Sequence, residues 1–284
     1  MKIIFSRKGV DSSSGGFASP LFADGSMYSV PIPDPRSPLC YADVKSDPDA
    51  GKLVSNLSAG SITKKTRVHL DPDLDAESLP RDKQWQPLFG QCGAAQSHLD
   101  KHGVTKGDLF LFFGWFREVE LVRRKWRFIP GAPDLHLFFG WLRVGRIVRV
   151  ADLLPDSGTS TSQWLQYHPH CHGNFSGVNT IYQAAQTLGL AGKKAPGAGV
   201  FRQYIRKRQL TAPGHSRSVW LLPNWMHPKG CESALSYHTD LSRWSSGNGR
   251  FTELRSVARG QEFVLDLEHY PEGYDWLKSL WSDQ

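Results

Sequence analysis

The chain has 284 residues, of which 39% are hydrophobic and 21% charged, and its formal net charge is +7. This composition is typical of a globular protein and excludes a disordered chain. No apolar run approaches the roughly 18–20 residues that span a bilayer, so we expect one soluble, cytoplasmic domain over residues 1–284 with no membrane partner. The four cysteines show no C-x-x-C pair, which favours reduced thiols.

Most of the predicted elements are strands, and no βαβ rhythm joins them. In chain order we expect a strand at 2–5, a long loop at 17–66, a turn at 69–74, a helix at 88–102, strands at 106–116, 119–129 and 135–150, a short helix at 178–188, strands at 218–225 and 262–267, and a C-terminal helix at 273–282. The predicted fold class is therefore α+β and β-rich, with a mainly antiparallel sheet or partial barrel and a few short helices.

One apolar octapeptide occurs twice, as LFLFFGWF at 109–116 and as LHLFFGWL at 135–142. Each copy is apolar at nearly every position, which predicts two strands buried on both faces. Two copies are too few for a repeat array. Gly114 and Gly140 occupy the same place in each copy, so we expect another backbone or a ligand to approach there.

A loop rich in glycine and serine, SRKGVDSSSGG, follows the first predicted strand. Backbone N–H groups in such a loop can bind phosphate while basic side chains neutralise it. The order of residues is not that of a P-loop, and an ordinary turn after a strand is the alternative. The candidate phosphate- or nucleic-acid-binding residues here are Arg7, Lys8, Ser12 and Ser13, with Asp11 as a candidate catalytic acid.

Two segments place imidazoles and carboxylates at alternating positions, HLDPDL at 69–74 and YHPHCHGN at 167–174. In an extended chain alternate residues share one face, and such groups suit a divalent metal or acid–base catalysis. The alternatives are an Asp-Pro turn capped by its own side chains and histidines on an exposed loop. The candidate catalytic residues are His69, Asp71, Asp73, His168 and His170, and the candidate metal ligands are His69, Asp71, His168 and His170.

Further basic and aromatic groups are weaker candidates. SYHTDLSRW offers His238 for catalysis and Arg243 for phosphate, and Gln261 could contact a base edge. Trp115 and Trp141 are the next-to-last residues of the two octapeptides, and basic residues cluster at 123–127. Aromatic and basic groups together suit base stacking and phosphate contact, so Arg117 and Arg143 join the candidate nucleic-acid-binding residues.

Nine segments together resemble the nucleotide modification associated domain 3 family. They include MKIIFSRKGVDSSSGGFASP, HLDPDL, FGQCGAAQSHL, GDLFLFFGWFR, YHPH and RGQEFVLD, in that order over nearly the whole chain. The resemblance implies synthesis or handling of hypermodified bases in phage and mobile-element DNA, but no particular reaction. The residues it places in motifs are Arg7, Lys8, Asp11, Ser12, His69, Asp71, Asp73, His168, His170, His238, Arg243 and Gln261. His172 lies outside the pattern.

Residues 106–150 also resemble the strand pair of PUA- and EVE-type barrels, which read modified bases. This resemblance implies a PUA/EVE-like β core at about 104–225 within the single domain.

Two functions remain open on the sequence. The first is an enzyme of nucleic-acid base hypermodification that binds a nucleotide or DNA phosphate and uses its Asp and His groups, with a divalent metal, iron or zinc, as the candidate cofactor. The alternative is a reader of modified DNA bases that catalyses nothing. Nucleotide or DNA is the expected partner in either case, and other base-modification proteins are further candidates.

Overall fold

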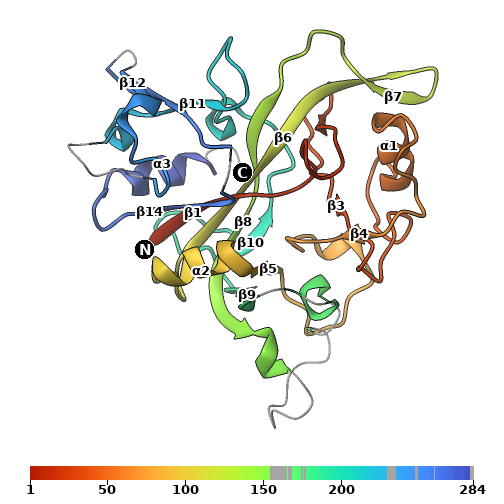
Figure 1. Ribbon diagram of the computed structural model, residues 1–284, viewed down its shortest axis with the longest axis horizontal. Coiled ribbons are helices and arrows are strands. Elements are labelled where there is room, and N and C mark those ends of the chain that lie inside the picture. The colour runs from red at the N-terminus through yellow and green to blue at the C-terminus, as the bar shows by residue number, and fades with distance from the viewer. Residues whose placement is uncertain are drawn as a thin grey trace.

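The fold is organised around one nine-stranded sheet in a computed structural model that describes residues 1–153, 165, 168–173, 175, 177–228, 235–246, 249–258 and 260–281 (Figure 1). Its main path runs through β14 (Glu262–Asp266), β1 (Lys2–Arg7), β6 (Leu109–Val122), β8 (Leu135–Arg149), β9 (Asn179–Ala184) and β5 (Leu88–Cys92). Three strands attach beside this path, β2 (Ser19–Leu21) and β7 (Lys125–Phe128) on β6 and β10 (Ala198–Val200) on β8. The sheet is mainly antiparallel and does not close into a barrel.

Smaller elements surround the sheet. The other strands are β3 (Ile32–Pro33), β4 (Val68–His69), β11 (Val219–Pro223), β12 (Trp244–Ser246) and β13 (Phe251–Arg255). The α-helices are α1 (Ala50–Leu57), α2 (Gly93–Lys101) and α3 (Gly273–Ser279). None of the helices within the described ranges is long and apolar enough to cross a membrane. The α+β, β-rich class predicted from the sequence is confirmed.

The two octapeptides form the centre of the sheet as neighbouring antiparallel strands. Phe112 of β6 pairs with Gly140 of β8. A Cβ atom on Gly114 would lie 2.8 Å from the Lys8 carbonyl oxygen, and one on Gly140 would lie 3.0 Å from the Gly199 carbonyl oxygen. The predicted close approach of another backbone is therefore confirmed at both glycines, and the duplication serves the scaffold.

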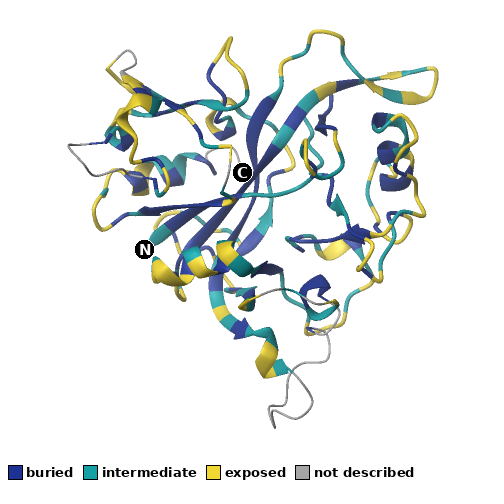
Figure 2. Cartoon of the chain, viewed as in Figure 1, coloured by how far each residue is buried: buried dark blue, intermediate teal, exposed yellow. Residues whose placement is uncertain are grey.

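The sheet is apolar on both faces, which is why the octapeptides do not alternate between apolar and polar residues. Ile3 and Phe5 of β1 enter one hydrophobic cluster, together with β11, β13 and α3, whereas Ile4 enters a second cluster with Phe110 and Phe89. Figure 2 shows the central strands buried and α2 largely exposed. Each fully buried Phe or Leu side chain contributes about 1.5–3 kcal/mol, so these clusters fix the frame on which the site is built.

The outer edge of β5 positions the site. One side of β5 pairs with β9, and on its other side the backbone of Asp73 exchanges two hydrogen bonds with Leu88, of 2.8 and 2.9 Å. The chain between β4 and Leu74 therefore runs beside β5 like a short additional strand. Gly93, directly after β5, begins α2.

The structure corrects three predicted elements. The helix predicted at 178–188 is wrong, because Asn179–Ala184 forms β9 between β5 and β8 and its β-branched residues suit that buried position. The helix predicted at 88–102 begins only at Gly93, since Leu88–Cys92 is β5. The loop predicted at 17–66 contains α1, which Asp49 caps by accepting a hydrogen bond of 2.7 Å from the Lys52 N–H.

Candidate metal centre

His69 and Asp71 come from the segment beside the free edge of β5. His69 is the last residue of β4. Asp71 lies two residues before Asp73, which pairs with Leu88, and so stands opposite Gly90 of β5. One carboxylate oxygen of Asp71, Oδ1, accepts a hydrogen bond of 2.7 Å from the Gly90 N–H. This hydrogen bond from β5 uses only Oδ1, so the other carboxylate oxygen, Oδ2, is available to contact the histidines. Both side chains are buried.

His168 and His170 approach β5 from a short 3₁₀ turn, Pro169–Cys171. The Nδ1 atom of His168 accepts the His170 N–H at 3.3 Å and so caps this turn. Gly90 makes the approach possible, because a Cβ atom there would overlap the ring of His170 and lie 2.8 Å from the His168 Cε1 atom. The glycine of β5 therefore holds the carboxylate through its N–H and leaves room for both imidazoles.

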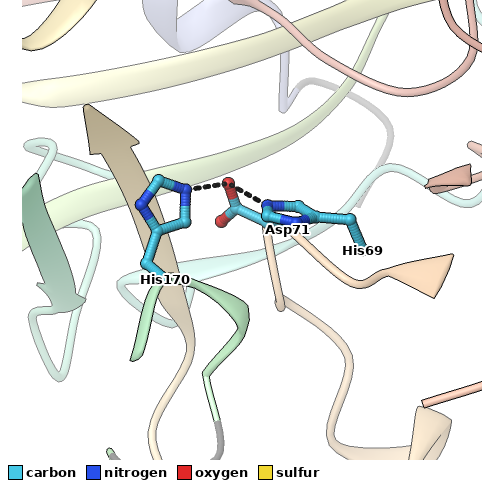
Figure 3. Close-up of side chains that lie close together, drawn as sticks. All are labelled: His69, Asp71 and His170. Atoms are coloured by element: carbon cyan, nitrogen blue, oxygen red, sulfur yellow. Dashed lines mark ion pairs between the residues drawn. The ribbon is translucent and has the colours of Figure 1, made fainter. Parts of the chain in front are cut away.

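Four side chains meet at this point, and we call His69, Asp71, His168 and His170 the histidine–aspartate cluster. The Nε2 atoms of His69 and His170 each lie 3.7 Å from Oδ2 of Asp71, and Figure 3 shows both rings facing this oxygen. The Nε2 atom of His168 lies 3.3 Å from the other oxygen, Oδ1. Residues about a hundred positions apart in the sequence thus converge on one carboxylate.

Hydrogen bonds on the far side of two rings set their tautomers. The Nδ1 atom of His69 lies 3.0 Å from the carboxylate of Asp34. An ionised carboxylate can only accept hydrogen bonds, so Nδ1 is the donor. The Nδ1 atom of His170 lies 2.7 Å from Oδ1 of Asn179, whose Nδ2 donates to the His170 carbonyl oxygen at 2.8 Å. Nδ1 of His170 is therefore also a donor. In the neutral forms both Nε2 atoms carry a free lone pair directed at Asp71.

His168 has the opposite tautomer. Its Nδ1 accepts the backbone N–H of His170, so in the neutral ring the proton is on Nε2 and faces Asp71. Two histidines of the cluster are thus arranged as ligands. The third places its Nε2 atom 3.3 Å from Oδ1 of Asp71, buried and without a well-aligned hydrogen bond in the described part of the chain.

The charge states suit a cation. Burial acts to raise the pKa of Asp71, but the neighbouring imidazoles, His168 first and His69 second, outweigh it and hold this pKa well below its ordinary value. Burial lowers the pKa of His170 to about 4, so its ring is neutral at pH 7. For Asp34, burial is opposed by hydrogen bonds from Arg36, and the pKa falls to about 2. A carboxylate and a neutral imidazole are the forms that bind metals.

The geometry also fits a metal ion. One oxygen of Asp71 and one nitrogen each of His69 and His170 lie within 4.8 Å of one another. Ligand atoms about 2.1 Å from a tetrahedral zinc ion lie about 3.4 Å apart, so the distances of 3.7 Å need to shorten only slightly. The bond from His69 to Asp34 is the carboxylate–histidine contact that orients ligands in many metal sites. Two histidines and one carboxylate leave coordination positions open for substrate or water.

Two other candidate catalytic residues lie outside this arrangement. Asp73 is engaged by Arg81, whose Nη1 and Nη2 atoms donate to its two oxygens at 2.7 and 2.5 Å. His238 is fully buried: its Nδ1 donates to the Ser236 carbonyl oxygen at 3.0 Å, and its Nε2 accepts the Val257 N–H at 3.2 Å. Both side chains have their hydrogen-bonding groups occupied inside the fold.

The glycine- and serine-rich loop closes on itself. Oδ1 of Asp11 accepts the N–H groups of Ser13 and Ser14 and the hydroxyl of Ser13, at 2.7–2.8 Å. Arg7 and Lys8 lie on opposite faces of the sheet. The guanidinium of Arg7 lies 5.7 Å from the ring centre of Phe113, whereas the ammonium of Lys8 lies 3.2 Å from Glu262. The loop therefore does not offer the N–H groups of Ser13 and Ser14 to a phosphate.

The remaining basic and aromatic candidates are spread over the fold. Arg117 donates to the Ile129 carbonyl oxygen at 3.5 Å, the side chain of Arg143 packs against Gly189, and Arg243 donates to the Arg255 carbonyl oxygen at 3.3 Å. Gln261 lines a cavity of about 620 Å³ together with Cys92. Trp141 is 3% exposed and packs against Phe201 and Trp281, so it cannot stack on a base.

Several residues of the site were not identified from the sequence. Asp34, Gly90 and Asn179 complete the cluster, but each lies in a different segment and none belongs to an alternating motif. Glu262 was missed because it stands within a strand: its Oε1 receives Ser6, Lys8 and Gln91, while its buried Oε2 has no partner among the described residues.

The family comparison agrees with the motifs. The family model described as nucleotide modification associated domain 3 matches residues 2–266 and so covers nearly the whole chain. No curated protein and no solved structure matches the chain. The name of the domain links the protein to nucleotide modification. With 265 of its 284 residues matched, the chain belongs to the nucleotide modification associated domain 3 family.

Proposed function

We propose that the protein is a metal-dependent enzyme that modifies a nucleic-acid base. The observation that carries this proposal is the convergence of two imidazole nitrogens and one carboxylate at the edge of β5. A buried carboxylate without a cation partner is costly, and a divalent ion bound by Asp71, His69 and His170 would compensate that cost. The family membership supplies the biological setting, nucleotide modification.

Iron and zinc are the two metals that this ligand set favours. Two histidines and one carboxylate bind Fe(II) in many oxygenases, and zinc with His₂ and a carboxylate activates water in many hydrolases. Iron would support oxidation of the base, whereas zinc would support hydrolysis or group transfer. In either case Asp34, Asn179 and His168 hold the ligands in the orientation that the metal requires.

A cavity that shares Asp71 with the cluster is the proposed place for the substrate, and its lining is partly polar and partly apolar. Its volume is about 270 Å³, and Asp71 lines it together with apolar side chains that include Met27, Leu70 and Phe139. Enzymes that act on a base within a duplex rotate it out of the stack into such a pocket, whereas a free nucleotide would enter directly. We therefore propose a nucleotide or DNA as the substrate, and other base-modification proteins as further partners.

A reader of modified bases is the second candidate, and the hairpin of β6 and β7 favours it. Arg123 and Arg124 are exposed at the turn, as is Lys125 at the start of β7, and this hairpin projects from the sheet (Figure 1). Such a basic hairpin could contact a DNA backbone. It serves an enzyme acting on DNA equally well, so it does not replace the metal centre as the basis of the proposal.

The test compares modified nucleosides in cells that also contain the other proteins of the base-modification pathway. DNA and nucleotide pools from cells with the wild-type protein and with the Asp71→Asn variant would be digested and analysed by mass spectrometry. We expect a nucleoside of altered mass in the wild type only. Identical nucleosides from both cells, with equal protein levels, would refute the proposed activity.

A further inference from the structure

A second polar cavity lies at the end of β1, on the side of the sheet to which Arg7 points. Its volume is about 460 Å³. Five segments line it: residues 7–12 at the end of β1 and beyond, Trp115 of β6, residues 133–136 at the start of β8, residues 215–218 and residues 256–258. None of the side chains of the histidine–aspartate cluster lines this cavity. It is therefore a separate site.

Two guanidinium groups face this cavity. Arg7 is held in place because its Nη atoms donate to the carbonyl oxygens of Ala258 and Val257, at 3.0 and 3.1 Å. Arg217 lies over the ring of Trp115, 4.1 Å from its centre. The contacts of Arg217 with oxygen are long, 3.4 Å to the Ser12 hydroxyl and 4.0 Å to Asp134, so they leave it short of strong acceptors.

Two polar atoms in the wall lack partners. The Nε–H group of Arg7 and the hydroxyl of Ser256 are both buried without a hydrogen-bond partner in the described part of the chain. Ser256 as a whole is only 6% exposed. Leaving such buried groups without a hydrogen bond is unfavourable. A small rearrangement around a ligand would allow both to bond, and both can donate.

The side chains that line the cavity carry charges of both signs, the guanidinium groups of Arg7 and Arg217 and the carboxylates of Asp11 and Asp134. Oδ1 of Asp134 accepts the Nε1–H group of Trp115 at 2.8 Å. Burial lowers the pKa of Arg7, Asp11 opposes this effect, and Arg217 adds to it through like-charge repulsion. The carboxylate oxygen Oδ1 of Asp11 is already occupied by its own turn. The buried ring of His136 lies at the floor, and Trp220 donates to its Nδ1 at 3.0 Å, so in the neutral ring Nε2 carries the proton. An anion would relieve the repulsion between the two arginines.

We infer that the cavity between Arg7 and Arg217 binds a phosphate group. Arginine is the side chain best suited to phosphate, since its planar N–H groups contact two oxygens at once. The ring of Trp115 is partly exposed beside Arg217, which suits a nucleotide or a DNA strand as the molecule that carries the phosphate. The site involves Arg7 and Ser12, as the sequence indicated, but Arg217 and Ser256 replace Lys8 and Ser13.

The experiment is titration calorimetry of the full chain with three probes: inorganic phosphate, a deoxynucleoside monophosphate and a short single-stranded oligonucleotide. Arg217→Gln should weaken binding about 10- to 100-fold, because a hydrogen-bonded charge pair is lost. Ser256→Ala removes a single oxygen and should weaken it several-fold. Arg146→Gln removes an exposed arginine of β8 that does not line the cavity and is the matched control, for which no change is expected.

The probes distinguish the source of the phosphate. Binding of all three, or of the monophosphate alone, supports a nucleotide site, and binding of the oligonucleotide alone supports a DNA backbone site. The inference is overturned if none of the probes binds at millimolar concentration, or if Arg217→Gln and Arg146→Gln bind equally well. Asp71→Asn should bind phosphate like the wild type, so this inference and the proposed metal chemistry can fail separately.

Discussion

The histidine–aspartate cluster and the Asp11 loop looked alike in the sequence, and the structure uses them differently. Oδ1 of Asp11 accepts three hydrogen bonds within its own turn, from the N–H groups of Ser13 and Ser14 and from the hydroxyl of Ser13. Asp71 accepts one backbone N–H from Gly90, and its Oδ2 faces His69 and His170. Polar content alone therefore does not predict a site. What matters is which lone pairs remain after the local hydrogen bonds have formed.

The strongest test of this difference is to make the same substitution at both aspartates and to measure metal affinity. Asp71→Asn should lower metal affinity more than about 100-fold, because it removes the anionic ligand, and loss of an outer partner alone costs about 10- to 100-fold. Asp11→Asn should leave metal affinity unchanged, since asparagine still caps the turn. Metal titration with a competing chelator measures both. Equal affinities for Asp71→Asn and wild type would contradict the assignment.

A second comparison sets His238 against His170. His238→Ala should lower the free energy of unfolding by about 2–4 kcal/mol, because it leaves a cavity and unpairs the Ser236 carbonyl and the Val257 N–H. Metal content should stay at the wild-type level. His170→Ala should instead lose the metal. It should lower the free energy of unfolding of the metal-free protein less than His238→Ala does. Urea unfolding monitored by fluorescence gives the first quantity, and elemental analysis gives the second.

The carboxylate behind His69 tests how the ligands are oriented. Asp34→Asn should weaken metal binding about 10- to 100-fold, because the ring of His69 loses the acceptor that fixes its tautomer. The loss of the ion pair with Arg36, which is half exposed, adds little to stability. Arg36→Gln is the control that separates the two effects. If Arg36→Gln weakens metal binding as much as Asp34→Asn does, the role given to Asp34 is wrong.

The smallest effects are expected for the two other histidines of the 168–172 segment. His168→Asn should weaken metal binding about tenfold, since it alters the donor to Asp71 but keeps both nitrogen ligands. His172→Ala should change it by less than about twofold, because His172 does not belong to the cluster. The same chelator competition ranks the variants. A larger loss for His172→Ala than for His168→Asn would place the metal elsewhere in this segment.

The scaffold could largely be predicted because its signals are local. The apolar octapeptides predicted β6 and β8, and alternating or continuous apolar runs predicted β1, β11 and β14. Residues 178–188 were misassigned because VNTIYQAAQTL is also compatible with a helix, and only its pairing with β5 and β8 decides for a strand. The helix α1 was missed although Leu53, Val54 and Leu57 form a buried face, because it has only eight residues and lies in a segment rich in Pro, Asp, Ser and Gly.

The cluster could be predicted only in part. Alternation correctly suggested that His69 and Asp71 share one side, as do His168 and His170, and the two segments meet as a metal site would require. The same alternation failed to indicate that Asp73 is taken by Arg81. Asp34 and Asn179 come from distant segments, and single residues without a motif carry no signal of such a contact. That these residues act in catalysis remains a prediction.

The central claim is that His69, Asp71 and His170 bind a metal. The most direct measurement is elemental analysis of protein purified without a histidine tag, combined with X-ray absorption spectroscopy of the bound metal. We predict about one equivalent of iron or zinc, coordinated by two imidazole nitrogens and a carboxylate, and none in Asp71→Asn. A wild-type protein that retains no metal after loading, or an Asp71→Asn variant that retains as much, would contradict the account.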